Sequence, residues 1–289
     1  MKRIVDVKTP RGSHWVGNGF PVRTLFSYSE DAPALSPFLL LDYAGPHVFT
    51  PSMTSRGVGE HPHRGFETVT IVYDGEVAHR DSTGHGGVIG PGDVQWMTAA
   101  GGILHEEFHS PGFTKAGGPF RMVQLWVNLP ASSKMSTPHY QAIARANIPV
   151  LALPVDAGQL RIIAGAHGGK TGPADTFTPT NVWDVRLTRD HDTTLNLPEG
   201  HTAMIAVLAG RVTINDTQAV GAAELIRFER TGSGVKIHAD ADAILLVLTG
   251  EPIDEPVAGY GPFVMNSQEE LRHAIDDFNS GKFSQISPA

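Results

Sequence analysis

The chain has 289 residues, of which 40% are hydrophobic and 18% charged, a composition that allows a folded core and excludes general disorder. Its net charge is -8, so the chain lacks the excess of Lys and Arg on which general nucleic-acid binding depends. Cysteine is absent, which excludes disulfides, zinc–thiolate sites and cysteine-ligated iron–sulfur clusters.

The first half of the chain is a series of short segments rich in β-branched and aromatic residues. Gly-containing turns separate them, and the 32 glycines and 21 prolines of the chain argue against a long helical bundle. The segments are PFLLLDYAG (37–45), ETVTIVYDGEVAHRD (67–81), GVIGPGDVQWMTA (87–99) and FRMVQLWVNL (120–129). Short strands at this spacing predict an all-β sandwich or barrel.

The second half repeats the pattern of the first. A polar stretch, PASSKMSTPHYQ (130–141), is predicted to be an inter-domain linker, and a second strand-rich region follows it. TVTIVYDGEVAHRD (68–81) is similar to AMIAVLAGRVTIND (203–216) when Gly75 is aligned with Gly210, an offset of 135 residues. We therefore expect two similar β-domains.

The C-terminal segment differs from both halves. Ser267 and Glu270 have the spacing of a capping box, which predicts the start of a helix. Apolar residues then recur at helical spacing and a glycine follows: Leu271, Ile275, Phe278 and Gly281. We expect one amphipathic helix that packs its apolar stripe on a barrel.

Histidines cluster in the first half. Six of the 14 fall between residues 61 and 109: His61, His63, His79, His85, His105 and His109. Residues two apart on an extended chain point to one face, so the pairs His61/His63 and His105/Glu107 could each direct two side chains at one ion. Three imidazoles and a carboxylate suit Fe(II), Mn, Ni or Cu and leave coordination positions open. The competing interpretation is a set of solvated histidines near turns.

Two other carboxylates compete with Glu107 for the metal. Glu106 points away from His105, whereas Glu67 shares the parity of His61 and His63 and could be a ligand or a supporting partner. The remaining histidines of the cluster fit less well, and we expect them at the surface: His79, His85 and His109.

These motifs resemble those of the cupins. HPHRGFET (61–68) followed by Gly75 is similar to the first cupin motif, and PGDVQWM (91–97) with GGILHEE (101–107) is similar to the second. The exact residues of these segments are more similar still to those of the pirin family. The segments that carry this resemblance are HPHRGFETVT, GEVAHRDSTG, GVIGPGDVQWMTA, GILHEEF, FLLLDYAGP (38–46) and GYGPFVMNSQEEL (259–271).

The pirin resemblance implies a bicupin, with two antiparallel jelly-roll β-barrels stacked face to face and a C-terminal helix. The implied parts are a metal-binding cupin domain (1–130), a metal-free cupin domain (131–260) and an extension with the helix (261–289). In the second half, His201 and His238 are isolated, and Asn196 and Pro198 stand where the first half has His61 and His63.

The resemblance also implies the ligands and the metal. Carried over position by position, the ligands are His61, His63, His105 and Glu107, which selects Glu107 over Glu67. Fe(II) is the favoured ion, with Mn, Ni, Cu, Co and Zn as alternatives.

The implied activity is that of a quercetinase, a dioxygenase that cleaves the heterocyclic ring of a flavonol with O₂ and releases carbon monoxide. Glu107, or alternatively Glu67, would act as general base on the 3-hydroxyl. Gln95, Trp96 and Met97 could contact a flat aromatic ligand or could be ordinary barrel core. The substrate could also be another chelating metabolite.

The alternative class is a non-enzymatic, iron-binding regulator that acts through a protein partner. We expect a cytoplasmic protein that contacts neither nucleic acid nor membrane directly.

Overall fold

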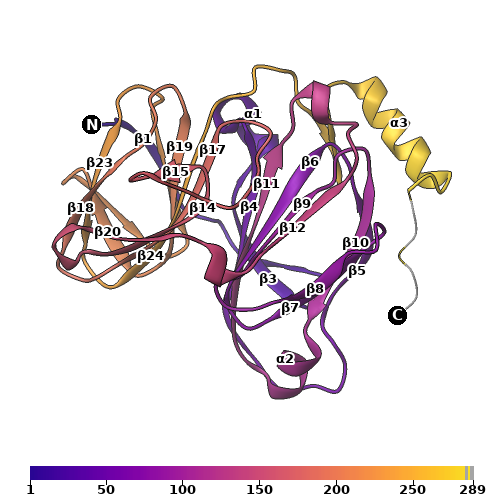
Figure 1. Cartoon of the computed structure of the whole chain (residues 1–289), viewed down its shortest axis with the longest axis horizontal. Helices are drawn as coiled ribbons and strands as arrows, with labels where there is room; N and C mark the ends of the chain where they lie inside the picture. Colours follow the sequence, from indigo (N-terminus) through magenta and orange to yellow (C-terminus); the bar gives the residue numbers. More distant parts are fainter. Residues whose placement is uncertain (284–285, 287–289) are drawn as a thin grey trace. The chain divides into compact units, whose positions relative to one another are not determined.

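The structure is a computed structural model that describes residues 1–283 and 286, and antiparallel strands dominate it (Figure 1). The chain forms two compact units. The N-barrel consists of residues 12–32, 38–145 and those from Ile253 on, and the C-barrel of residues 1–11, 33–37 and 146–252.

The N-barrel has two sheets. The larger has seven strands, in the order β12 (His139–Ile143), β9 (Val94–Thr98), β6 (Phe66–Asp74), β11 (Gly118–Asn128), β4 (Phe38–Phe49), β3 (Phe20–Ser27) and β2 (His14–Val16). The smaller has four, in the order β5 (Gly57–His63), β10 (Ile103–His109), β7 (Val77–Asp81) and β8 (Gly86–Ile89).

The C-barrel repeats this plan. Its seven-stranded sheet has the order β1 (Ile4–Lys8), β22 (Glu224–Phe228), β19 (Thr202–Ala209), β24 (Ala243–Gly250), β17 (Thr180–Leu187), β14 (Gly158–Ala164) and β13 (Val150–Ala152). Its four-stranded sheet has the order β18 (Asp192–Asn196), β23 (Gly234–Ala239), β20 (Arg211–Ile214) and β21 (Gln218–Gly221). The predicted all-β bicupin fold is thus confirmed.

Short elements complete the chain. The strands among them are β15 (Ala166–His167), β16 (Lys170–Thr171), β25 (Ala258–Tyr260) and β26 (Phe263–Met265). The helices are α1 (Tyr28–Leu35), α2 (Pro111–Ala116), α3 (Gln268–Asn279) and the 3₁₀ turns Ala131–Ser133, Arg145–Asn147 and Pro154–Asp156. No helix in the described part of the chain has the length and apolarity that crossing a bilayer requires.

The internal repeat rests on one kind of turn. Strand β6 passes through Gly75 into β7, and β19 passes through Gly210 into β20. Gly75 has φ of 83°, and a Cβ there would lie 2.7 Å from the Phe120 ring, so no larger residue fits. The alignment of the two glycines therefore marks equivalent turns, at which the chain passes from the larger sheet to the smaller.

Strand pairing over long sequence distances moves the unit boundaries away from 130 and 260. β1 pairs with β22, which places the first residues of the chain in the C-barrel. β12 pairs with β9, so the end of the predicted linker 130–141 belongs to a sheet. The residue pattern of one segment does not indicate which distant strand pairs with it.

The residues after 252 close the N-barrel. The Arg64 N–H donates to the Pro262 carbonyl (3.2 Å), and the Val264 N–H donates to the Arg64 carbonyl (3.0 Å). The buried Lys134 ammonium donates to the carbonyls of Gly65 (2.7 Å) and Val264 (2.9 Å). The segment that follows the histidine strand is thus hydrogen-bonded to the end of the chain.

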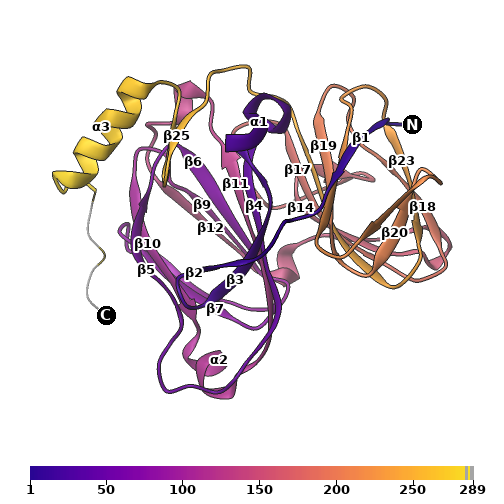
Figure 2. The same ribbon diagram turned by 180° about the vertical axis from the view of Figure 1, so that it is seen from behind.

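Helix α3 is the long helix near the C-terminus in Figure 2. It has the predicted capping box, in which Ser267 and Glu270 exchange hydrogen bonds. It packs through Leu271 and Ala274, with Ile275 partly buried, against a cluster that includes Leu104 and Phe263. Phe278 was expected in the buried stripe, but it is 38% exposed. The helix turns this position toward its edge, where Phe278 only flanks Phe263 and Phe283.

Candidate metal centre

Three histidines converge on the inner face of the smaller N-barrel sheet. β5 supplies His61 and His63, and the neighbouring β10 supplies His105 directly opposite His61. Their candidate ligand nitrogens all lie within 4.8 Å of one another. The two-residue spacing predicted this convergence.

The histidine nitrogens lack the partners that buried polar atoms normally have. Both ring nitrogens of His63 and of His105 are buried without a hydrogen-bond partner. His61 differs, because its Nδ1 lies 2.8 Å from the Gly59 carbonyl. A proton on Nδ1 then leaves Nε2 of His61 unprotonated and available to an ion.

Electrostatics keeps the buried imidazoles neutral. Burial lowers the pKa of His63 and of His105 well below the ordinary value, and the neighbouring imidazoles lower it further. Neutral imidazole is the form that binds a metal. Three converging imidazoles, two of them neutral and with unpartnered nitrogens, fit a transition-metal ion.

Glu107 lies next to this cluster. The register shift between His105 and Glu107 lies in β5, where three residues span what two span in β10, so Glu107 keeps the face of His105 but lies opposite Val58. It accepts hydrogen bonds from Gln124 Nε2 (3.0 Å to Oε2) and from Thr70 Oγ1 (3.4 Å). Burial raises its pKa, which His61 and these hydrogen bonds oppose. The three histidines form the 4.8 Å group without Glu107.

The competing carboxylates point elsewhere. Thr70 faces Glu107, so Glu67, three residues away on β6, lies on the opposite face of the sheet. There Glu67 accepts a hydrogen bond from Thr98 (2.7 Å), and burial raises its pKa to about 7. Glu106 forms an ion pair with Arg80. Neither carboxylate belongs to the histidine cluster, and Glu67 lies on the face of β6 opposite to the one that Glu107 contacts.

The other histidines of the sequence cluster occupy three different environments. His85 is exposed, as predicted. The surface prediction is wrong for His79 and His109, which are 5% and 1% exposed. The His109 Nε2–H donates to the Gly19 carbonyl (2.9 Å), and the ring lies within a cluster of phenylalanine rings that includes Phe49. Strand parity places His79 and His109 inside the barrel. Their position near a turn or a strand end had wrongly indicated that they are exposed.

Strand register decides which residues of β9 face the cluster. Gln95 lies opposite Thr70 and shares its inner face, whereas Trp96 lies opposite Val69 on the other face. Met97 returns to the inner face. Of the three candidate contacts for an aromatic ligand, only Gln95 and Met97 can therefore serve.

Sequence analysis did not single out Thr70 and Gln124, which hold the Glu107 carboxylate. The available signal was a polar residue at an inward position of an otherwise apolar strand, in TVTIVY (68–73) and FRMVQLW (120–126). The apolar wall beside His63 comes from Phe66 and Trp126, whose rings lie 5.1 and 5.4 Å from its ring.

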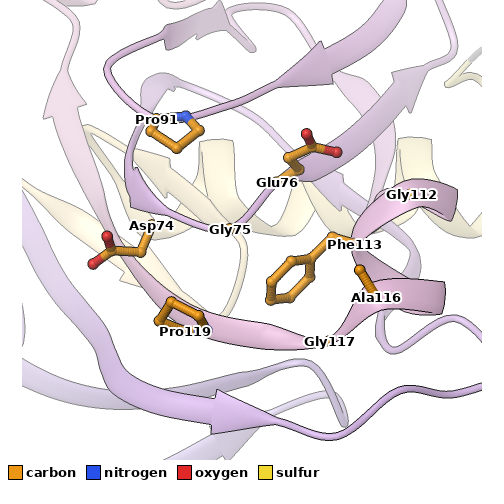
Figure 3. Close-up of a pocket in the computed structure, with 9 residues that line it drawn as sticks. All are labelled: Asp74, Gly75, Glu76, Pro91, Gly112, Phe113, Ala116, Gly117 and Pro119. Carbon is orange, nitrogen blue, oxygen red and sulfur yellow. The ribbon is translucent and has the colours of Figure 1, made fainter.

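A hollow of about 530 Å³ lies in another part of the N-barrel, between the turn at Gly75 and helix α2 (Figure 3). Asp74, Glu76 and Phe113 line it, and none of the candidate ligands does. Asp74 ends β6, whereas Phe66, beside His63, begins it. The hollow is therefore separate from the histidine cluster.

Comparison with known families matches both units. The profile described as Pirin matches residues 19–127, and the one described as Pirin C-terminal cupin domain matches residues 182–284. The chain belongs to the pirin family.

Individual pirin relatives cover nearly the whole chain. A Pseudomonas aeruginosa protein named "Putative quercetin 2,3-dioxygenase" is 56% identical over 98% of this chain and 99% of its own. Pirin-1 of Arabidopsis thaliana is 36% identical over 98% of this chain and 95% of its own. A crystal structure of quercetin 2,3-dioxygenase from Acinetobacter baumannii has a TM-score of 0.97 and 53% identity, and the match covers 99% of this chain and 100% of that one.

Proposed function

We propose that this pirin is a metal-dependent dioxygenase of the quercetinase type that cleaves flavonols such as quercetin, with iron as its metal. The observation that carries the proposal is the convergence of three imidazoles, two of them neutral and with unpartnered buried nitrogens, next to a buried carboxyl. The names of the Pseudomonas and Acinetobacter relatives support the same activity.

His61, His63 and His105 would hold the ion, with Glu107 as the fourth ligand. A bound ion of this kind supplies redox chemistry with O₂ and lowers the pKa of an oxygen that chelates it. Mn, Ni, Cu, Co and Zn are the alternatives to iron that this ligand set also accommodates.

Glu107 would take the 3-hydroxyl proton of the flavonol. The raised pKa of its carboxyl brings it closer to that of a phenol and so favours proton transfer. Gln124 and Thr70 both donate to this carboxyl and fix its orientation. Phe66 and Trp126 provide apolar surface for a flat ring beside His63.

The test is an anaerobic titration of iron-loaded protein with quercetin, followed by air. We expect a shift of the flavonol absorption on binding, and then its loss together with release of carbon monoxide. Glu107→Gln preserves the shape but removes the negative charge, so turnover should fall further than metal content does. Binding without ring cleavage in air would refute the dioxygenase proposal and favour the regulator that acts through a protein partner.

A further inference from the structure

A hydrogen-bonded triad lines the inner face of the N-barrel next to Glu107. His79 lies directly opposite Glu107 on the neighbouring strand β7, and strand parity puts both on the same face. Gln95 Nε2 lies 3.1 Å from His79 Nδ1, and the Tyr140 hydroxyl lies 2.7 Å from His79 Nε2. The triad joins β7, β9 and β12, and therefore both sheets of the barrel.

The hydrogen bonds fix which atoms of the triad stay available. The Gln95 amide nitrogen can only donate, so His79 Nδ1 accepts and carries no proton. The proton of the neutral ring then sits on Nε2 and is donated to the Tyr140 oxygen. The hydroxyl proton of Tyr140 is left free to donate to another group.

Two acceptors beside the triad are unsatisfied. Gln95 Oε1 is buried without a partner on a residue that is 1% exposed. Asp81 follows His79 on the same face of β7. Its Oδ1 accepts a hydrogen bond from the Thr83 N–H, but its Oδ2 is buried without a partner. A buried acceptor without a donor destabilises the fold, because it has lost its hydrogen bonds to water and gained none in return. The site thus lacks hydrogen-bond donors.

We infer that Gln95 and Tyr140, oriented by His79, form a second polar subsite that binds a hydroxyl group of the substrate away from its chelating oxygens. A phenolic hydroxyl fits this pattern, since it donates to Gln95 Oε1 and accepts from the Tyr140 hydroxyl. The aromatic rings agree with a flat ligand, because Tyr140 stands 5.1 Å from His79 and stacks on His85 at 5.8 Å. The inference rests on the proposed function for the identity of the chelating part and specifies the rest of the substrate as a hydroxylated aromatic.

The test measures the preference for a hydroxyl in anaerobic, iron-loaded protein. We compare the dissociation constants of quercetin and of 3-hydroxyflavone, which keeps the chelating pair but lacks the other hydroxyls. Wild type should favour quercetin, and Gln95→Met and Tyr140→Phe should each reduce that preference roughly five- to tenfold. The control Tyr260→Phe, at a residue that is 69% exposed, should leave it unchanged. Metal content should be the same in all four proteins.

A second pair of probes keeps this test separate from the dioxygenase proposal. Phenol and anisole differ in whether they can donate, and neither chelates a metal. By titration followed by NMR, phenol should bind wild type more tightly than anisole, and Gln95→Met should abolish the difference. Equal binding of phenol and anisole to wild type would overturn the subsite and assign the free acceptors to water, even if quercetin is cleaved. A phenol preference that depends on Gln95 would support it even without any ring cleavage.

Discussion

Replacing Leu271 with Ala tests whether α3 is a packed part of the N-barrel. Leu271 is 3% exposed and lies in one cluster with side chains of β10 and β26. Removing a buried Leu side chain costs about 2–5 kcal/mol, because the apolar contact is lost and a cavity remains. Phe278 is 38% exposed and opens to solvent. Its truncation leaves no closed cavity and should cost only about 1–2 kcal/mol.

Thermal and urea denaturation of the two variants provide the measurement. For a chain of this size a loss of about 3 kcal/mol lowers the melting temperature by roughly 6–12 °C. We expect Leu271→Ala to show a fall of this order, Phe278→Ala a clearly smaller one, and both to keep their metal and their elution volume. A larger effect of Phe278→Ala, or an unchanged melting temperature with a changed elution volume in Leu271→Ala, would refute the packing described for α3.

Three further predictions concern ligands and charge. Ala at His61, His63 or His105 should abolish stoichiometric metal binding, and full occupancy by elemental analysis in any of these variants would contradict the assignment. His201→Ala and His238→Ala should leave metal content and turnover unchanged; loss of metal in either would show that the C-barrel takes part in binding. The pKa of Glu67 is raised from its ordinary value to about 7. The folded state therefore holds this proton more tightly than the unfolded state, and the resulting stability is present at pH 4 and lost as the pH rises through 7. Glu67→Gln should remove this dependence and raise the free energy of unfolding at pH 8 by about 1–3 kcal/mol. If urea denaturation gives wild type and Glu67→Gln the same dependence of stability on pH, the raised pKa of Glu67 is contradicted.

Local patterns predicted much of the fold and of the site. The two-residue spacing of His61 and His63 placed both on one face of a strand, and the Ser267–Glu270 capping box located the start of α3. Both features depend only on a few neighbouring residues, so the local geometry of a strand or a helix is enough to predict them.

Features that depend on a distant partner could not be predicted in this way. His79 looked like a surface residue beside a turn, yet it is buried because Gln95 and Tyr140 bind both of its ring nitrogens. Phe278 had the correct helical spacing, but its burial depends on how β26 lies against the helix, and this leaves the side chain 38% exposed. The strand β1 has no local sign that its partner is β22, more than 200 residues later.

The hydrogen bonds between Arg64 and residues Pro262 and Val264 have a consequence for biosynthesis. A ribosome makes the histidine strand early, but the backbone groups beside His63 gain their partners only when the last part of the chain has emerged. The segment beside His63 can therefore complete these hydrogen bonds only after the residues up to 264 have been synthesised. A translation product that stops before Pro262 would lack this closure, and the strand that carries His61 and His63 would end in unpaired backbone groups.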